Sequence, residues 1–154
     1  MCFGTFDLLH PGHDAYVRQA ASFGRRGKAK NEVIVVVARD RTVVEVKGQL
    51  PLTNEQDRRA RVEAHPLVTK AILGKEGDKY AVIEDEAPDV LFLGYDQQAF
   101  TERLESELVS RGLSIRVVRG EPFEPERYHT SILLGETDEE DAWQEDEEEA
   151  GLPL

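Results

Sequence analysis

One ten-residue stretch near the start of the sequence decides the fold: Gly4-Thr5-Phe6-Asp7-Leu8-Leu9-His10-Pro11-Gly12-His13. It separates a short apolar segment from a helical pattern over residues 14–23, which predicts a strand-to-helix turn. Pro11 suits the first helical position, where its missing N–H costs nothing. Free backbone N–H groups at such a terminus, together with the helix dipole, form a site for phosphate. His10 and His13 add two further donors.

Two other interpretations of this histidine pair are weaker. The pair could bind a metal ion, but no third cysteine, histidine or carboxylate lies nearby in an obvious ligand pattern, so no metal ligands are assigned. Two ordinary surface histidines would leave the surrounding glycines and proline without a reason. The whole stretch therefore favours an anion site at the start of a helix.

The composition predicts a single domain followed by an acidic tail. The chain has 154 residues and a net charge of −12, but residues 136–150 hold ten of the 31 acidic residues and none of the 19 basic ones. We therefore predict a nearly neutral domain over residues 1–135 and a disordered tail over 136–154. Such a balance predicts no nucleic-acid surface. One cysteine and no apolar run of about 20 residues predict a cytoplasmic protein without membrane contact.

Alternating strand and helix patterns predict an α/β fold with a doubly wound parallel sheet. The predicted strands cover residues 33–38, 71–73, 89–93 and 113–118. The predicted helices cover residues 14–23, with Gly24 as cap, 54–63 with Thr53 as cap, 78–86 with Asp78 as cap, 97–111 closed by Gly112, and 132–134. Residues 42–52 are predicted to form a loop or a short helix.

Polar residues and glycines gather where the predicted strands end. They are the ten-residue stretch, Arg39-Asp40, Gly74-Lys75, Gly94-Tyr95-Asp96, Gly120 and residues 127–131. Parallel strands bring these ends to one edge of the sheet, where ligands bind in such folds. We therefore expect an active site at this edge. Neither a phosphate-binding P-loop nor a Gly-x-Gly-x-x-Gly fingerprint occurs in the sequence.

The opening stretch resembles the G-x-F-D-x-x-H-x-G-H signature of the cytidylyltransferase-like nucleotidyltransferases, which have a Rossmann-like fold. Residues 38–43, 47–48, 74–78 and 94–97 are similar to those of the archaeal FAD synthases, and the likeness covers about residues 3–135. The resemblance implies transfer of AMP from ATP to FMN, giving FAD and pyrophosphate. It also implies Mg²⁺ or another divalent metal, bound with the nucleotide, and a homodimer is a further expectation.

The same resemblance implies roles for individual residues. The implied catalytic residues are His10, His13 and Lys47, with the lysine placed on a loop. The implied nucleotide-binding residues are Thr5, Phe6, His10, Pro11, Gly12, His13, Asp96, Tyr128 and Ser131. The second family signature is the weaker match, because the segment that starts at Arg127 lacks its glycine. Arg58 is expected either to face the site or to be solvated.

The residues also leave two alternative functions open. The chain could be a cytidylyltransferase acting on a small phosphorylated alcohol such as glycerol 3-phosphate, or a nucleotide-binding protein without turnover.

The first strand of the predicted sheet is unusually short. Residues 1–3 provide only part of it, and such a fold places this strand in the middle of the sheet. We therefore predict a truncated first strand and a natural start several residues upstream.

Overall fold

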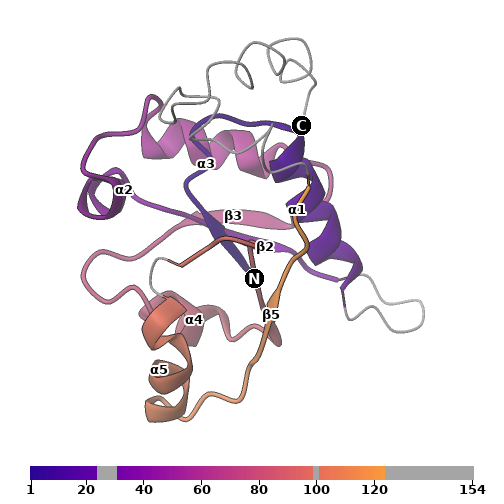
Figure 1. Ribbon diagram of the computed structural model, residues 1–154, viewed down its shortest axis with the longest axis vertical. Helices are drawn as coiled ribbons and strands as arrows, with labels where there is room; N and C mark the ends of the chain where they lie inside the picture. Colours follow the sequence, from indigo (N-terminus) through magenta and orange to yellow (C-terminus); the bar gives the residue numbers. More distant parts are fainter. Residues whose placement is uncertain (24–30, 99–100, 124–154) are drawn as a thin grey trace.

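A five-stranded parallel sheet forms the centre of the computed structural model, which describes residues 1–23, 31–98 and 101–123 (Figure 1). The strand order is β3-β2-β1-β4-β5. The strands are β1 (Cys2–Gly4), β2 (Ile34–Val37), β3 (Lys70–Leu73), β4 (Val90–Leu93) and β5 (Arg116–Arg119). Because β4 returns to the far side of β1, the chain winds outward in both directions from β1, which confirms the predicted doubly wound sheet.

The described residues form five α-helices, four of which cover the two faces of the sheet (Figure 1). They are α1 (Pro11–Ser22), α2 (Asp40–Lys47), α3 (Glu55–Glu63), α4 (Ala81–Glu86) and α5 (Leu104–Ser110), the last preceded by a 3-10 turn at Thr101–Arg103. In Figure 1, α1 and α3 lie on one side of the sheet and α4 and α5 on the other. No helix in the described part of the chain is long and apolar enough to cross a membrane.

Alternating side chains of the strands fill the two core layers. Val35 on one face of β2 belongs to the cluster that contains Val17 of α1 and Val62 of α3. Val36, on the opposite face, belongs to the cluster that contains Ile83 of α4. A strand covered on both sides buries nearly every residue, which explains the unbroken valine run in the sequence.

The central strand β1 is short, and the residue before it adds hydrogen bonds to β4. It pairs with β2 along its whole length but with β4 only through Cys2. Met1 extends the contact with β4, since its ammonium group donates to the Val90 carbonyl (2.8 Å) and its carbonyl accepts from the Phe92 N–H (2.8 Å). β1 is one residue shorter than each of the other strands of the sheet. The upstream start stays a prediction.

Two helix starts differ from the sequence-based prediction. Asn54 caps α3, because its side-chain oxygen accepts from the Asp57 N–H at 2.9 Å. The predicted cap, Thr53, is instead held by tertiary contacts, with its carbonyl accepting from the Arg58 side chain. α4 begins after Tyr80, and Asp78 closes a turn before the helix by accepting from the Tyr80 N–H at 3.0 Å.

Other differences concern the extent of the helices. The predicted helix over 97–111 is shorter and begins with the 3-10 turn, and Gly112 follows its end in a left-handed conformation (φ 68°). For residues 42–52, where a loop or a short helix is predicted, the structure has the helix α2, which starts earlier, at Asp40. The predictions for Gly24, for the helix over 132–134 and for the tail over 136–154 lie outside the described residues.

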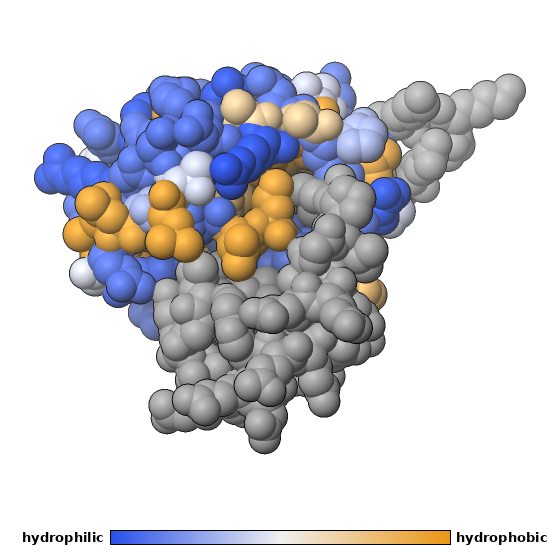
Figure 2. Space-filling model, turned by 90° about the horizontal axis from the view of Figure 1, so that it is seen from above, coloured by the Kyte–Doolittle hydropathy of each residue, from blue (hydrophilic) through white to orange (hydrophobic). Residues whose placement is uncertain are grey.

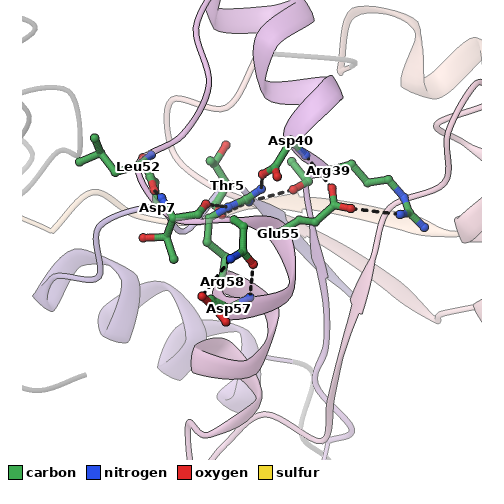
Figure 3. Close-up of polar contacts among 11 residues, drawn as sticks. Thr5, Asp7, Arg39, Asp40, Leu52, Glu55, Asp57 and Arg58 are labelled. Carbon is green, nitrogen blue, oxygen red and sulfur yellow. Dashed lines mark hydrogen bonds and ion pairs between the residues drawn. The ribbon is translucent and has the colours of Figure 1, made fainter.

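The Arg58 side chain joins three separate backbone segments near the carboxyl ends of β1 and β2 (Figure 3). Its side chain is fully buried, and its Nη1 donates to the carbonyls of Thr5 (2.7 Å) and Ala38 (2.8 Å). Its Nε donates to the Thr53 carbonyl (2.9 Å), and its Nη2 pairs with Asp40 Oδ1 (2.6 Å). Of the two alternatives for Arg58, the solvated one is therefore wrong, because the buried side chain ties the ends of β1 and β2 to the start of α3.

Two carboxylates reinforce this connection. The Asp7 carboxylate accepts from the N–H groups of Leu52 (2.8 Å) and Thr53 (2.9 Å), which binds the loop before α3 to the turn after β1. The Glu55 carboxylate accepts from the Asp40 N–H (2.8 Å) and pairs with Arg39 (3.4 Å), as Figure 3 shows. Charge-assisted bonds of this kind are stronger than neutral ones. The edge of the sheet is thus held by several charged anchors.

Replacing Arg58 by alanine is expected to lower the free energy of unfolding by about 3 kcal/mol or more, since it leaves buried carbonyls without donors. Arg61→Ala is the matched control, because Arg61 is an exposed arginine of the same helix with one long contact to Thr53 (3.4 Å). Urea unfolding of both variants measures the difference. Equal stabilities of the two variants would contradict the structural role of Arg58.

Candidate active site

A pocket of about 380 Å³ lies at the carboxyl ends of the strands. Residues of the turn after β1, of α2, and of the segments that follow β3, β4 and β5 line it. The topology changes direction beside β1, and ligands of open α/β sheets bind at such a point. The expectation that the strand ends form one site therefore agrees with the position of this pocket.

The two histidines of the opening stretch stack on each other in this pocket. Their ring centroids lie 3.9 Å apart at an interplanar angle of 27°. His10 is the N-cap of α1, and its Nδ1 accepts from the Gly12 N–H at 3.1 Å. A neutral ring that accepts at Nδ1 carries its proton on Nε2, so His10 has Nε2 as its donor atom. The Phe6 ring, 5.1 Å from His13, completes the aromatic group.

The first amide groups of α1 are already engaged, which corrects the expectation of free N–H donors there. Pro11 has no N–H, and the Gly12 N–H is bound to the His10 ring. The N–H groups of His13 (2.9 Å) and Asp14 (3.4 Å) are bound to the His10 carbonyl. The positive end of the helix dipole remains, but the donors that face the pocket here are the imidazoles.

Gly4 and Phe6 give the turn after β1 its shape. A Cβ atom on Gly4 would lie 2.7 Å from the Phe6 ring, a distance that real side chains do not show. Phe6 itself has a positive φ of 55°, which is uncommon for a residue other than glycine. Thr5, between them, uses its carbonyl to accept from Arg58. The hydrogen bonds of the two adjacent residues, Thr5 and Asp7, keep Phe6 in this strained conformation.

Lys47 is the last residue of α2 and lines the pocket, so the expected position on a loop is wrong. Gly48 ends the helix in a left-handed conformation (φ 81°), and its N–H donates to the Val44 carbonyl at 2.8 Å. Within the described part of the chain, Lys47 forms no ion pair. Its charge is therefore available to an anionic ligand.

Three more cations line the same side of the pocket. They are Arg39, Lys75 and Lys79, paired with Glu55 (3.4 Å), Asp85 and Glu45 (4.0 Å), respectively. Arg39 and Lys75 belonged to the residues expected at strand ends. Lys79 was missed, because it lies in a connection whose position relative to the sheet has no local sequence signal.

The opposite side of the pocket is a turn after β4 that Arg119 holds. Its Nη1 donates to the carbonyls of Gly94 (2.8 Å) and Gln97 (2.8 Å), and the Gly94 N–H donates to the Gln97 side chain (3.2 Å). The turn places Asp96 at the pocket, as the sequence predicted. Because the strands β4 and β5 are neighbours, a residue at the end of β5 can fix the turn after β4.

A pair of hydrogen bonds fastens the segment after β5 to α1. The Gln19 side chain donates to the Glu121 carbonyl (3.1 Å) and accepts from the Glu121 N–H (2.9 Å). The backbone of Gly120 lies close to the Phe92 ring, since a Cβ atom at this position would lie 2.9 Å from the ring. The sequence did not reveal Gln19, because a glutamine on an amphipathic helix has no distinguishing pattern.

Two buried groups near the pocket stay protonated at neutral pH. Burial raises the pKa of the Cys2 thiol to about 11 and the pKa of Tyr16 well above its usual value. The Tyr16 hydroxyl donates to the Phe92 carbonyl at 2.6 Å. Neither group can therefore serve as a general base near neutral pH.

The structure brings most of the predicted site residues to one pocket. Those that line it are Thr5, Phe6, His10, Gly12, His13, Lys47 and Asp96. Pro11 begins α1 but is not part of the lining. Arg127, Tyr128 and Ser131 lie outside the described residues. Among residues 1–23, 31–98 and 101–123, no group of three or more histidines, cysteines and carboxylates could hold a metal ion.

Comparisons with known proteins give consistent results. The model of the family described as cytidylyltransferase-like matches residues 1–146. The FAD synthase of Aciduliprofundum boonei is 43% identical over 119 residues, which are 77% of this chain and 75% of that protein. The FAD synthase of Methanosarcina mazei is 43% identical over 116 residues, 75% of this chain and 72% of that protein. The resemblance to archaeal FAD synthases is thereby confirmed.

A solved structure supports the fold independently. The lipopolysaccharide core biosynthesis protein from Thermoplasma volcanium matches with a TM-score of 0.71 and 34% sequence identity. The match covers 80% of this chain and 96% of that one. The architecture of this chain thus also occurs in a solved structure with related sequence.

Proposed function

The chain belongs to the cytidylyltransferase-like family, and we propose that it transfers AMP from ATP to FMN, giving FAD and pyrophosphate. The observation that carries the proposal is the stacked pair His10 and His13 at the start of α1, facing the pocket of a chain whose relatives are FAD synthases. The chain is accordingly a nucleotidyltransferase, and FMN is the acceptor of the nucleotidyl group.

The reaction needs positioning and charge stabilisation more than proton transfer. The second pKa of a phosphate monoester is about 6, so the attacking oxygen of FMN is already anionic at neutral pH. This oxygen forms a bond to the α-phosphorus of ATP, and the bond from that phosphorus to the bridging oxygen of pyrophosphate breaks. Neither Cys2 nor Tyr16, whose pKa values burial raises, supplies a base at neutral pH.

His10 and His13 stabilise the charge that develops on the α-phosphoryl group. Their rings face the pocket at the positive end of α1, and preorganised donors of this kind supply much of the stabilisation in phosphoryl-type transfers. Lys47 approaches from α2 and neutralises phosphate charge on the other side. Bringing two anionic substrates together requires such hydrogen-bond donors and cations around the reacting phosphates.

A divalent metal such as Mg²⁺ would be bound together with the triphosphate of ATP. Mg²⁺ is usually held by one or two carboxylates together with substrate phosphates. The donor set of the pocket fits this mode, since Asp96 and Glu121 line it as individual carboxylates and the described residues contain no cage of protein ligands. Bound in this way, the metal would neutralise charge on the departing pyrophosphate.

The alternative of a cytidylyltransferase for glycerol 3-phosphate is not favoured, because the curated relatives are FAD synthases. Incubation with Mg²⁺, ATP and FMN is expected to yield FAD, detected by chromatography. A parallel incubation with CTP and glycerol 3-phosphate is expected to yield little product. Product only from the second mixture, or from neither, would contradict the proposal, and the latter result would favour a nucleotide-binding protein without turnover.

Replacing His13 by alanine is expected to lower kcat by about 100-fold or more, the size typical of removing one preorganised donor. The affinity for ATP should change much less, because the ring acts mainly on charge that develops in the transition state. Arg18→Ala serves as control, since Arg18 is an exposed residue of the same helix. An increase of KM without a fall in kcat would assign His13 to substrate binding instead.

A further inference from the structure

One face of α2 forms a wall of the pocket. Val43, Val46 and Lys47 are separated by three and four positions, so they lie on the same side of an α-helix. All three line the pocket, whereas Val44, between them in the sequence, does not. Together with Thr42, these residues form the face of α2 that lines the pocket.

Val46 is unusual among the apolar residues of this wall. Val43 is buried at 4% exposure, but Val46 is 52% exposed although it lines the pocket. Several apolar side chains also interrupt the polar surface of the molecule when it is seen from above (Figure 2). An exposed valine in a pocket wall contributes to binding only when an apolar part of the ligand covers it.

The chemistry of this wall distinguishes between acceptor classes. Lys47 suits the phosphate of any phosphorylated acceptor, since a lysine provides a point charge without shape selectivity. Val46 suits only an acceptor that also has an apolar surface. A phosphorylated polyol is hydroxylated throughout, whereas FMN joins its phosphate to a planar aromatic ring system through a ribityl chain. The combination of lysine and exposed valine fits the flavin.

The opposite side of the pocket offers different chemistry. The turn at Gly94 and Gln97 has backbone polar groups that Arg119 fixes through the carbonyls. Two aromatic residues, Tyr95 and Phe123, line the pocket in the segments after β4 and β5. Polar groups in a fixed turn suit the ribose of a nucleotide and the edge of its base, and aromatic side chains suit the face of the base. His10 and His13 follow β1, which lies between β2 and β4, so the reacting phosphates would meet in the centre with one ligand on either side.

We propose that the pocket face of α2 holds the isoalloxazine ring of FMN, with Val46 as the apolar platform that selects a flavin over a polyol phosphate. The proposal rests on the proposed function, because FMN is the acceptor that it assigns. It adds the side of the pocket that the acceptor occupies and the residue that determines its class. The phosphate of FMN then extends past Lys47 toward the two histidines.

The test compares Val46→Ser with Val44→Ser, two valine-to-serine changes on the same helix. Val46→Ser is expected to raise the KM for FMN about fivefold, as loss of part of an apolar contact predicts. The KM for ATP and kcat should stay within about twofold of the wild-type values, because the contact is the same in ground and transition states. Val44→Ser should leave all three values unchanged, and thermal unfolding of both variants verifies that the helix remains folded.

Riboflavin binding provides a second measurement that does not depend on turnover. Riboflavin has the ring and the ribityl chain without the phosphate, so equilibrium dialysis reports the ring site alone. Its affinity should fall about fivefold in Val46→Ser and stay unchanged in Val44→Ser. Equal affinities in the two variants would overturn the ring site even if the wild type makes FAD. If the wild type makes no FAD but binds riboflavin through Val46, the proposed function fails and the ring site stands.

Discussion

The fully buried guanidinium of Arg58 is the interaction on which the rest of the structure depends. Its donors serve the carbonyls of Thr5 and Ala38, at the paired ends of β1 and β2, and the carbonyl of Thr53 before α3, so the side chain fastens the start of α3 to the sheet. A charge taken out of water is costly unless every partner is well placed, so the network is either complete or strongly destabilising. Asp7 adds a second link to the same loop. The turn that carries the two histidines is therefore anchored by charged contacts to α3 and to the loop before it. A precise site requires support of this kind.

This support allows the pocket to act through electrostatics. The first amides of α1 are consumed by His10, so the structure offers imidazole rings instead of a nest of backbone N–H groups. Lys47 stands opposite at the end of α2, and the buried thiol and phenol nearby remain neutral. An attacking phosphate that is already ionised needs no base, only an environment in which two anions can approach each other. The site meets this requirement with imidazole donors held at the start of α1 and with the charge of Lys47 at the end of α2.

Local pattern was sufficient to predict the sheet and the turn after β1. The valine run of β2 and the ten-residue stretch each have a signature that depends only on nearby residues. Prediction was wrong where distant contacts decide, as at Thr53, whose backbone groups are taken by Asp7 and Arg58 so that Asn54 becomes the cap. Gln19 and Lys79 were missed for the same reason, since their importance comes from Glu121 and from the pocket and not from their neighbours in sequence. The histidines were found because their glycines and proline mark the turn that presents them.

The central claim is that the α-phosphoryl group of ATP reacts beside His10 and His13 at the start of α1. A crystal structure with FMN and an ATP analogue that has a methylene group between the α- and β-phosphorus tests this claim directly, because the analogue cannot release pyrophosphate. We expect an α-phosphate oxygen within hydrogen-bond distance of an imidazole nitrogen, about 3 Å. An α-phosphate bound elsewhere in the pocket, with both imidazoles turned away from it, would contradict the account.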